Sequence, residues 1–119
     1  MKEHIIRDFK EGLRNAVYEM NKKRGLINKL FYKQEIYLEE NNKEPDEIYI
    51  RAGYHKKRIN QETGIFQIGV TELAKIKINQ EGLEGYACSY DKKLINPLKE
   101  FLHNFSHQYQ VSLGCLANI

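Results

Sequence analysis

The spacing of the apolar residues changes twice along the chain, and these changes constrain the fold more than any other feature. Near the N-terminus the apolar side chains recur at helical spacing and would form one stripe: Ile6, Phe9, Leu13, Ala16, Val17 and Met20. From Glu47 onwards apolar and polar residues alternate, which is typical of half-buried strands. After Asn96 the helical spacing returns. The pattern therefore predicts a helix, then a sheet, then another helix.

The segment after the first helix allows two interpretations. Cations at positions 22–24 followed by Gly25 are typical of a helix C-terminus, so the first helix should end there. In one interpretation, residues 26–38 form a second helix that stops at residues 41–45. In the other, this helix ends near Lys33, and residues 36–38 form a strand paired with residues 48–51 through a loop at 39–46. The chain thus begins with a helix or a helical hairpin.

The middle of the chain predicts an antiparallel meander of three to five strands. Alternating apolar residues mark strands at residues 48–51, 66–70 and 74–78, and a further strand is expected at 86–90. Gly64 and residues 82–85 are expected to form the turns between them. A meander of this kind exposes one face and buries the other against helices.

The last segment predicts a C-terminal helix packed on one face of the sheet. Asn96 and Pro97 suit the N-cap and the first helical position, and Gly114 is expected to terminate the helix. The apolar stripe of this helix contains five residues: Leu98, Phe101, Leu102, Phe105 and Tyr109. Helices on one side of an antiparallel sheet give an α+β fold, and we expect one domain over residues 1–119.

Composition places the chain among ordinary globular proteins, with 41% hydrophobic and 29% charged residues. Charged side chains interrupt the first ten positions, so we expect no secretory signal, no membrane association and a cytoplasmic location. The two cysteines, Cys88 and Cys115, are expected to be free thiols in such a compartment.

Charge is distributed in blocks, although the net charge is only +3. Residues 1–33 hold nine basic and four acidic side chains, whereas residues 34–50 hold one and six. Residues 51–58 hold four basic side chains and no acidic one. Such blocks create separate surface fields, which suit charged partners.

The basic blocks and the tyrosines favour a small non-enzymatic accessory protein of a bacterium or phage that binds RNA or DNA as a regulator. Cations hold phosphates, and exposed aromatic rings stack on unpaired bases. The predicted contacts are Arg7, Lys10 and Arg14 on the first helix, with Tyr49, Arg51, Lys56, Lys57, Arg58, Lys75 and Lys77 on the sheet and its loop. Tyr86 and Tyr90 are further candidates for stacking, and His55 lies within the loop cluster. This hypothesis requires both basic clusters to lie on one face.

The acidic residues between Glu35 and Glu47 support the alternative of a protein partner, because complementary charged patches steer protein encounters. Such a chain would be an inhibitor, an immunity factor or a chaperone of the secretion type that masks a partner surface. A homodimer of the chain is a further alternative.

A metal-dependent enzyme is the least favoured hypothesis, and no cofactor is expected. Glu100, His103 and His107 share one face of the last helix and have the spacing to reach one metal ion, with Cys88 or Cys115 as a further ligand. The chain nevertheless lacks the C-x2-C and H-E-x-x-H motifs, the glycine-rich phosphate loops and the G-x-S-x-G motif. A cysteine nucleophile formed by Cys88 with His55 or His103 is supported by residue type alone.

Overall fold

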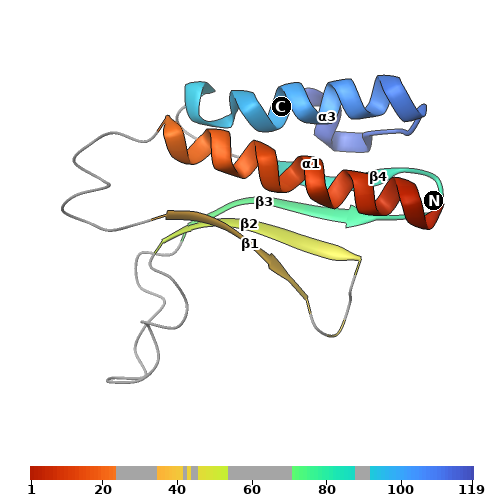
Figure 1. Ribbon diagram of the computed structural model, residues 1–119, viewed down its shortest axis with the longest axis horizontal. Coiled ribbons are helices and arrows are strands. Elements are labelled where there is room, and N and C mark those ends of the chain that lie inside the picture. Colours follow the sequence, from red (N-terminus) through yellow and green to blue (C-terminus); the bar gives the residue numbers. More distant parts are fainter. Residues whose placement is uncertain (24–34, 42, 44–45, 54–70, 88–91) are drawn as a thin grey trace.

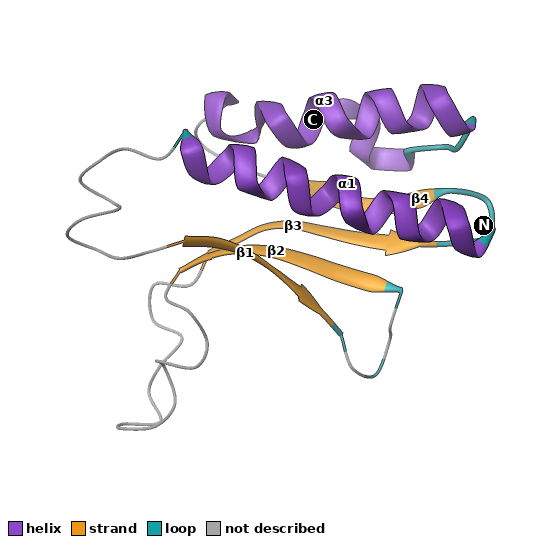
Figure 2. Cartoon of the chain, in the orientation of Figure 1, coloured by secondary structure: helices purple, strands orange, loops and turns teal. Residues whose placement is uncertain are grey.

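Two helices lie side by side on one face of a four-stranded antiparallel sheet (Figures 1 and 2). The computed structural model describes residues 1–23, 35–41, 43, 46–53, 71–87 and 92–119. Its elements are α1 (Glu3–Lys22), β1 (Glu35–Glu40), β2 (Glu47–Gly53), β3 (Thr71–Ile78), β4 (Leu83–Ala87), α3 (Lys92–Tyr109) and the 3-10 helix η2 (Gly114–Asn118). The strands follow the order β1-β2-β3-β4. The α+β fold with an antiparallel meander is therefore confirmed.

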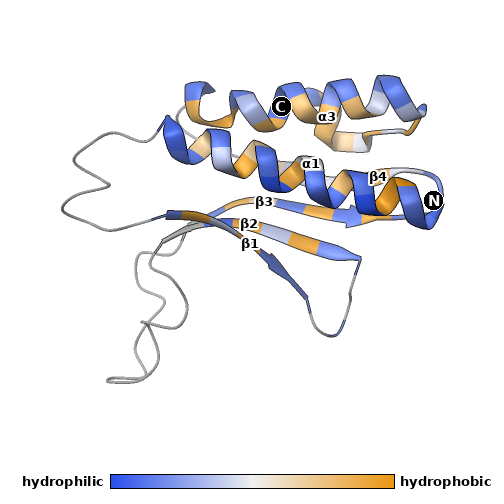
Figure 3. Cartoon of the chain, in the orientation of Figure 1, coloured by the Kyte–Doolittle hydropathy of each residue, from blue (hydrophilic) through white to orange (hydrophobic). Residues whose placement is uncertain are grey.

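Helix α1 buries the predicted apolar stripe. Phe9, Leu13 and Met20 are fully buried, and hydrophobic bands alternate with hydrophilic ones along the helix (Figure 3). The helix ends at Lys22, next to the expected cations. None of the helices in the described part of the chain is long and apolar enough to cross a membrane.

Residues 35–40 form a strand, which decides between the two interpretations of this segment. Strand β1 pairs antiparallel with β2, and Leu38 lies opposite Ile50. A strand directs Ile36 and Leu38 towards α1 and the intervening Tyr37 to the other face, which a helix would not do. Residues 24–34, the rest of the proposed second helix, lie outside the described residues.

A β-bulge interrupts the pairing of β2 with β3. Ile50 lies opposite Ala74, but the next residue, Arg51, lies opposite Glu72. Leu73 is therefore the extra residue, and it is buried together with Ala74. The bulge keeps Glu72 on the same face as Arg51.

The turn before β4 comes earlier in the sequence than expected. The backbone N–H of Asn79 donates to the carbonyl of Gly82 at 2.8 Å, and β4 begins at Leu83, a residue predicted to lie in the turn. Leu83 is 1% exposed, so burial of its side chain places it in the sheet. The predicted strand at 66–70 and residues 88–90 of the last one lie outside the described residues.

Helix α3 begins before the predicted N-cap. It starts at Lys92, and Pro97 lies inside it rather than at its first position. Ile95 and Leu98 are both buried, so the apolar stripe extends one turn towards the N-terminus. The free energy gained by burying this additional turn outweighs the cost of the backbone N–H that proline lacks.

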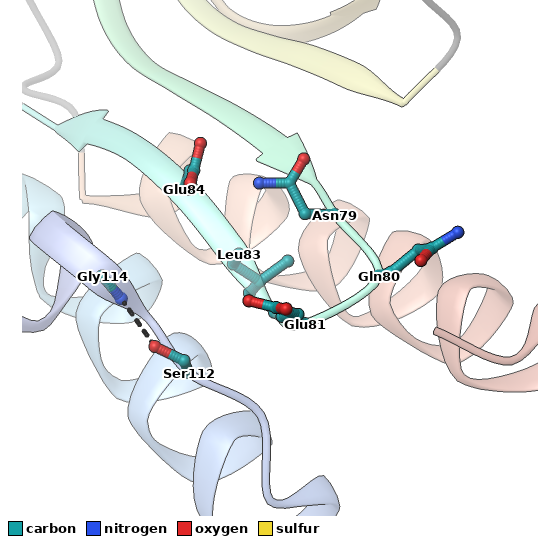
Figure 4. Close-up of a pocket in the computed structure, with 8 residues that line it drawn as sticks. Asn79, Gln80, Glu81, Leu83, Glu84, Ser112 and Gly114 are labelled. Atoms are coloured by element: carbon teal, nitrogen blue, oxygen red, sulfur yellow. Dashed lines mark hydrogen bonds between the residues drawn. The ribbon is translucent and has the colours of Figure 1, made fainter.

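The chain beyond α3 returns to the sheet. Gln110, with φ of 57°, is the left-handed residue that follows the helix, so Gly114 does not terminate it as predicted. The N–H of Leu83 donates to the carbonyl of Ser112 at 2.8 Å, which fixes the C-terminal segment beside β4. Figure 4 shows the shallow pocket between this segment and the β3–β4 turn, with the hydrogen bond from the N–H of Gly114 to Oγ of Ser112.

Candidate protein interface on the open sheet face

The sheet face opposite α1 and α3 carries polar and aromatic side chains from all four strands. We call it the open sheet face, because no helix of the described chain covers it (Figure 1). Strand alternation and the observed pairing assign ten side chains to it: Tyr37, Glu39, Glu47, Tyr49, Arg51, Glu72, Lys75, Lys77, Glu84 and Tyr86. Glu35, at the start of β1, lies two residues before Tyr37 and therefore on the same face.

Arg51 is held between carboxylates of two neighbouring strands. Its guanidinium lies 2.9 Å from Glu39 of β1 and 3.7 Å from Glu72 of β3. It also stacks on the ring of Tyr49, 4.5 Å from the ring centroid. The β-bulge is required for this arrangement, because it places Glu72 directly opposite Arg51. The positive charge of Arg51 is thus neutralised within the sheet.

A second group joins Glu47, Tyr49 and Lys75. The Lys75 ammonium lies 3.4 Å from the Glu47 carboxylate, and the Tyr49 hydroxyl donates a hydrogen bond to the same carboxylate. This hydrogen bond lowers the pKa of Glu47 and raises the pKa of Tyr49. Hydrogen bonding to Glu47 raises the pKa of Lys75. At neutral pH the group therefore contains a carboxylate, a neutral phenol and an ammonium ion.

Tyrosines flank these charged groups on both outer strands. Tyr86 of β4 is 46% exposed, and its hydroxyl donates to Glu72. Tyr37 of β1 lies opposite Arg51, and burial, followed by the charge of Glu39, raises the pKa of its phenol. These rings are held by hydrogen bonds or charged neighbours and still reach solvent.

The open sheet face is acidic in sum. Its described charged side chains are five carboxylates and three cations, which gives a net charge of −2: Glu35, Glu39, Glu47, Glu72 and Glu84 against Arg51, Lys75 and Lys77. A net negative face repels a polyanion.

The cations predicted to bind nucleic acid divide between the two layers. Tyr49, Arg51 and Lys75 come together on the open sheet face, with Lys77 next to them on β3. Arg7, Lys10 and Arg14 lie on α1, in the helical layer on the opposite side of the sheet. His55, Lys56, Lys57, Arg58 and Tyr90 lie outside the described residues. Within the described ranges, the cations form no continuous platform.

The metal-ligand candidates remain on the surface of α3. Glu100, His103 and His107 are all exposed. In the part of the chain that is described, no three His, Cys, Asp or Glu side chains are grouped so that they could hold a metal ion. Cys115 is a free, exposed thiol on η2, and Cys88 lies outside the described residues.

The carboxylate partners of Arg51 and Lys75 were not identified from the sequence. Alternation alone would have placed Glu39 and Glu47 on the same face as Tyr49. Glu72 could not be found in this way, because the bulge at Leu73 reverses the parity of β3. Comparison with known proteins adds no assignment: no protein-family model matches the chain, and no curated protein or solved structure matches it significantly.

Proposed function

We propose that the protein is a non-enzymatic binding module whose open sheet face contacts a protein partner. The observation that carries this proposal is the fixed position of Arg51, between Glu39 and Glu72 and over the ring of Tyr49. Arginine and tyrosine are enriched in the buried centres of protein interfaces. Here both residue types are held in place before any partner arrives, which reduces the entropy lost on binding.

The pairing of the charges favours a protein over a nucleic acid. Burial of an unpaired charge in an interface is costly, whereas a charge that keeps its partner loses less on dehydration. Arg51 and Lys75 keep their carboxylates in this way. A phosphate would have to displace those carboxylates from a face that is already negative. A protein that masks a partner surface, as inhibitors and chaperones do, is consistent with this arrangement.

Site-specific photocrosslinking in cells of the source organism tests the proposal. A benzophenone amino acid replaces Tyr86 on the open sheet face, and in a matched variant it replaces His103 on the exposed side of α3. We expect a discrete protein adduct that resists nuclease from position 86 and none from position 103. The absence of an adduct at 86, or the same adducts at both positions, would count against the proposal.

Binding to single-stranded RNA and DNA oligonucleotides gives an independent test. Fluorescence anisotropy at low salt should show no binding that depends on Arg51. If binding were to fall steeply with added salt and to disappear in Arg51→Ala, the open sheet face would instead be a nucleic-acid interface, since each neutralised phosphate releases counterions.

A further inference from the structure

A pocket of about 180 Å³ lies between α1 and the outer edge of the sheet, on the side of the sheet opposite to the open sheet face. Its lining combines three apolar side chains, of which Leu13 and Ile48 are buried, with three charged ones: Leu13, Leu38 and Ile48 with Lys10, Arg14 and Glu40. Lys10 lies 3.3 Å from Glu40, so that pair is internally neutralised. Arg14 is exposed, and no carboxylate of the described residues lies within ion-pair distance of it. We call this the edge pocket.

The outer edge of β1 is partly occupied by a side chain of α1. The Asn21 amide accepts a hydrogen bond from the N–H of Ile36 at 2.8 Å and donates to its carbonyl at 2.9 Å. The amide thus makes the two hydrogen bonds that a neighbouring strand would make. On the other side of β1, the N–H of Asn41 donates to Glu47 of β2. Odd-numbered positions thus direct their backbone N–H and carbonyl groups towards β2. The even-numbered residues of β1 direct theirs outward, away from the sheet.

This parity leaves two further positions open on the edge. The N–H and carbonyl groups of Leu38 and Glu40 point away from β2, and the described residues supply no hydrogen-bond partner for them. Both residues also line the edge pocket. Outward backbone groups beside a pocket with apolar and charged lining are the two elements of recognition by strand addition, in which the main chain gives affinity and the pocket gives specificity.

The flank of α1 above this edge is cationic. Arg7, Lys10, Arg14 and Asn21 fall within about 60° of one another around an ideal helix. Because Asn21 and Lys10 both contact β1, this flank faces the strand along its length. In an added strand, every second side chain would point towards α1, and one beside Leu38 would meet Arg14.

We propose that the edge pocket and the outer edge of β1 bind an extended segment of a partner protein as a fifth strand. In this segment an apolar residue occupies the edge pocket, and an acidic residue two positions away pairs with Arg14. The acidic preference follows from Arg14, which has no carboxylate partner among the described residues, since Lys10 is already held by Glu40. This site lies on the other side of the sheet from the open sheet face and does not depend on the proposed function.

A second copy of the chain fits this edge poorly. If two copies paired antiparallel with Leu38 opposite Leu38, Glu40 of one copy would lie opposite Ile36 of the other. Asn21 already occupies that place beside Ile36. Self-pairing about Glu40 would set two Glu40–Lys10 pairs directly opposite each other, which crowds like charges together. A heterologous peptide avoids both conflicts.

Selection from a random peptide display library on the immobilised full-length chain tests this proposal. We expect enriched peptides with an apolar residue and an Asp or Glu two positions apart. In solution, Arg14→Glu should weaken the selected peptide by roughly tenfold or more, since it replaces attraction by repulsion. Enrichment of basic peptides, no enrichment, or undiminished binding to Arg14→Glu would overturn the proposal.

A matched pair of variants tests the backbone contact. Glu40→Pro removes an outward N–H without removing a hydrogen bond to β2, and Glu40→Ala removes the same side chain but keeps the N–H. Peptide binding should be lost in the first and retained in the second. Equal binding by both variants, with circular dichroism confirming that Glu40→Pro is folded, would refute strand addition. If Glu40→Pro does not fold, Arg14→Glu decides the matter alone.

Two cross-checks separate this site from the open sheet face. Arg51→Ala should leave peptide binding unchanged, and Arg14→Glu should leave the photocrosslink from position 86 unchanged. Sedimentation of the full chain gives the last outcome: a dimer abolished by Glu40→Pro but not by Glu40→Ala would identify a second copy as the occupant and overturn the proposal.

Discussion

Gly12 of α1 lies so close to the ring of Phe101 in α3 that a Cβ at Gly12 would stand 2.2 Å from Cε1 of that ring. The ring cannot withdraw freely, because it stacks on Phe9 with a centroid distance of 5.5 Å and packs against Phe105 at 5.9 Å. The missing side chain at position 12 therefore sets how closely the two helices approach over the sheet.

Gly12→Ala should lower the free energy of unfolding by about 1–3 kcal/mol, the usual cost of overpacking. The loss is expected even though alanine favours a helix by about 1 kcal/mol over glycine. Urea denaturation followed by circular dichroism measures the change, with Asn15→Ala on the exposed side of α1 as the control. A Gly12→Ala variant as stable as the wild type would show that the ring moves aside.

Gly85→Ala should prevent stable folding of β4. Gly85 has φ of 139°, and a Cβ there would lie 1.8 Å from the carbonyl oxygen of Lys75, a backbone atom of the neighbouring strand. The matched variant Gly114→Ala also places alanine at a positive φ, 54°, but its Cβ meets Leu83 only at 3.3 Å. It should cost only about 1–2 kcal/mol. Dispersion of the amide NMR spectrum distinguishes the two outcomes, and a well-folded Gly85→Ala protein would contradict this account.

Stability should depend on pH through Glu47. Its pKa is lowered from the ordinary value of 4.5, chiefly by the hydrogen bond from Tyr49, so the folded chain binds this proton less tightly than the unfolded chain. The resulting stabilisation is present above 4.5 and is lost as pH falls through the lowered pKa. Glu47→Gln should therefore be less stable than the wild type at neutral pH, and the difference should shrink in acid.

Urea midpoints measured from neutral pH down to about pH 3 check this expectation, because the range includes the ordinary pKa of 4.5, below which the stabilisation starts to be lost. Tyr49→Phe supplies the control, since removal of the hydroxyl should move the pKa of Glu47 back towards its ordinary value. A difference between wild type and Glu47→Gln that does not change with pH would assign the effect to packing rather than to ionisation.

Asn21→Ala should destabilise the first strand pair by about 1–2 kcal/mol, because the amide satisfies both backbone groups of Ile36. Hydrogen exchange of the Ile36 amide should accelerate more than exchange at Ile50 in the centre of the sheet. Asn104→Ala, at an exposed position of α3, provides a comparison without a strand contact. Unchanged protection of Ile36 would show that Asn21 does not close the edge.

The side chains of the open sheet face were only partly predictable. Alternation in residues 47–51 and 74–78 placed Tyr49, Arg51, Lys75 and Lys77 together, because the side-chain period of a strand is local. The neutralisation of Arg51 was not predictable, since Glu39 reaches it through the register of β1 and Glu72 reaches it through the bulge. The same cations that suggested phosphate binding are, in the folded chain, the partners of carboxylates.

The sequence alone determined the apolar stripes of both helices, the alternation of β2 and β3 and hence an α+β fold, because these periods are set by neighbouring residues. Only the tertiary structure decided that residues 35–40 form a strand, that α3 begins at Lys92 and that the cations of α1 and of the sheet lie in different layers. These features depend on which surfaces meet across the core, and burial there outweighs local preferences such as that of Pro97 for a helix start.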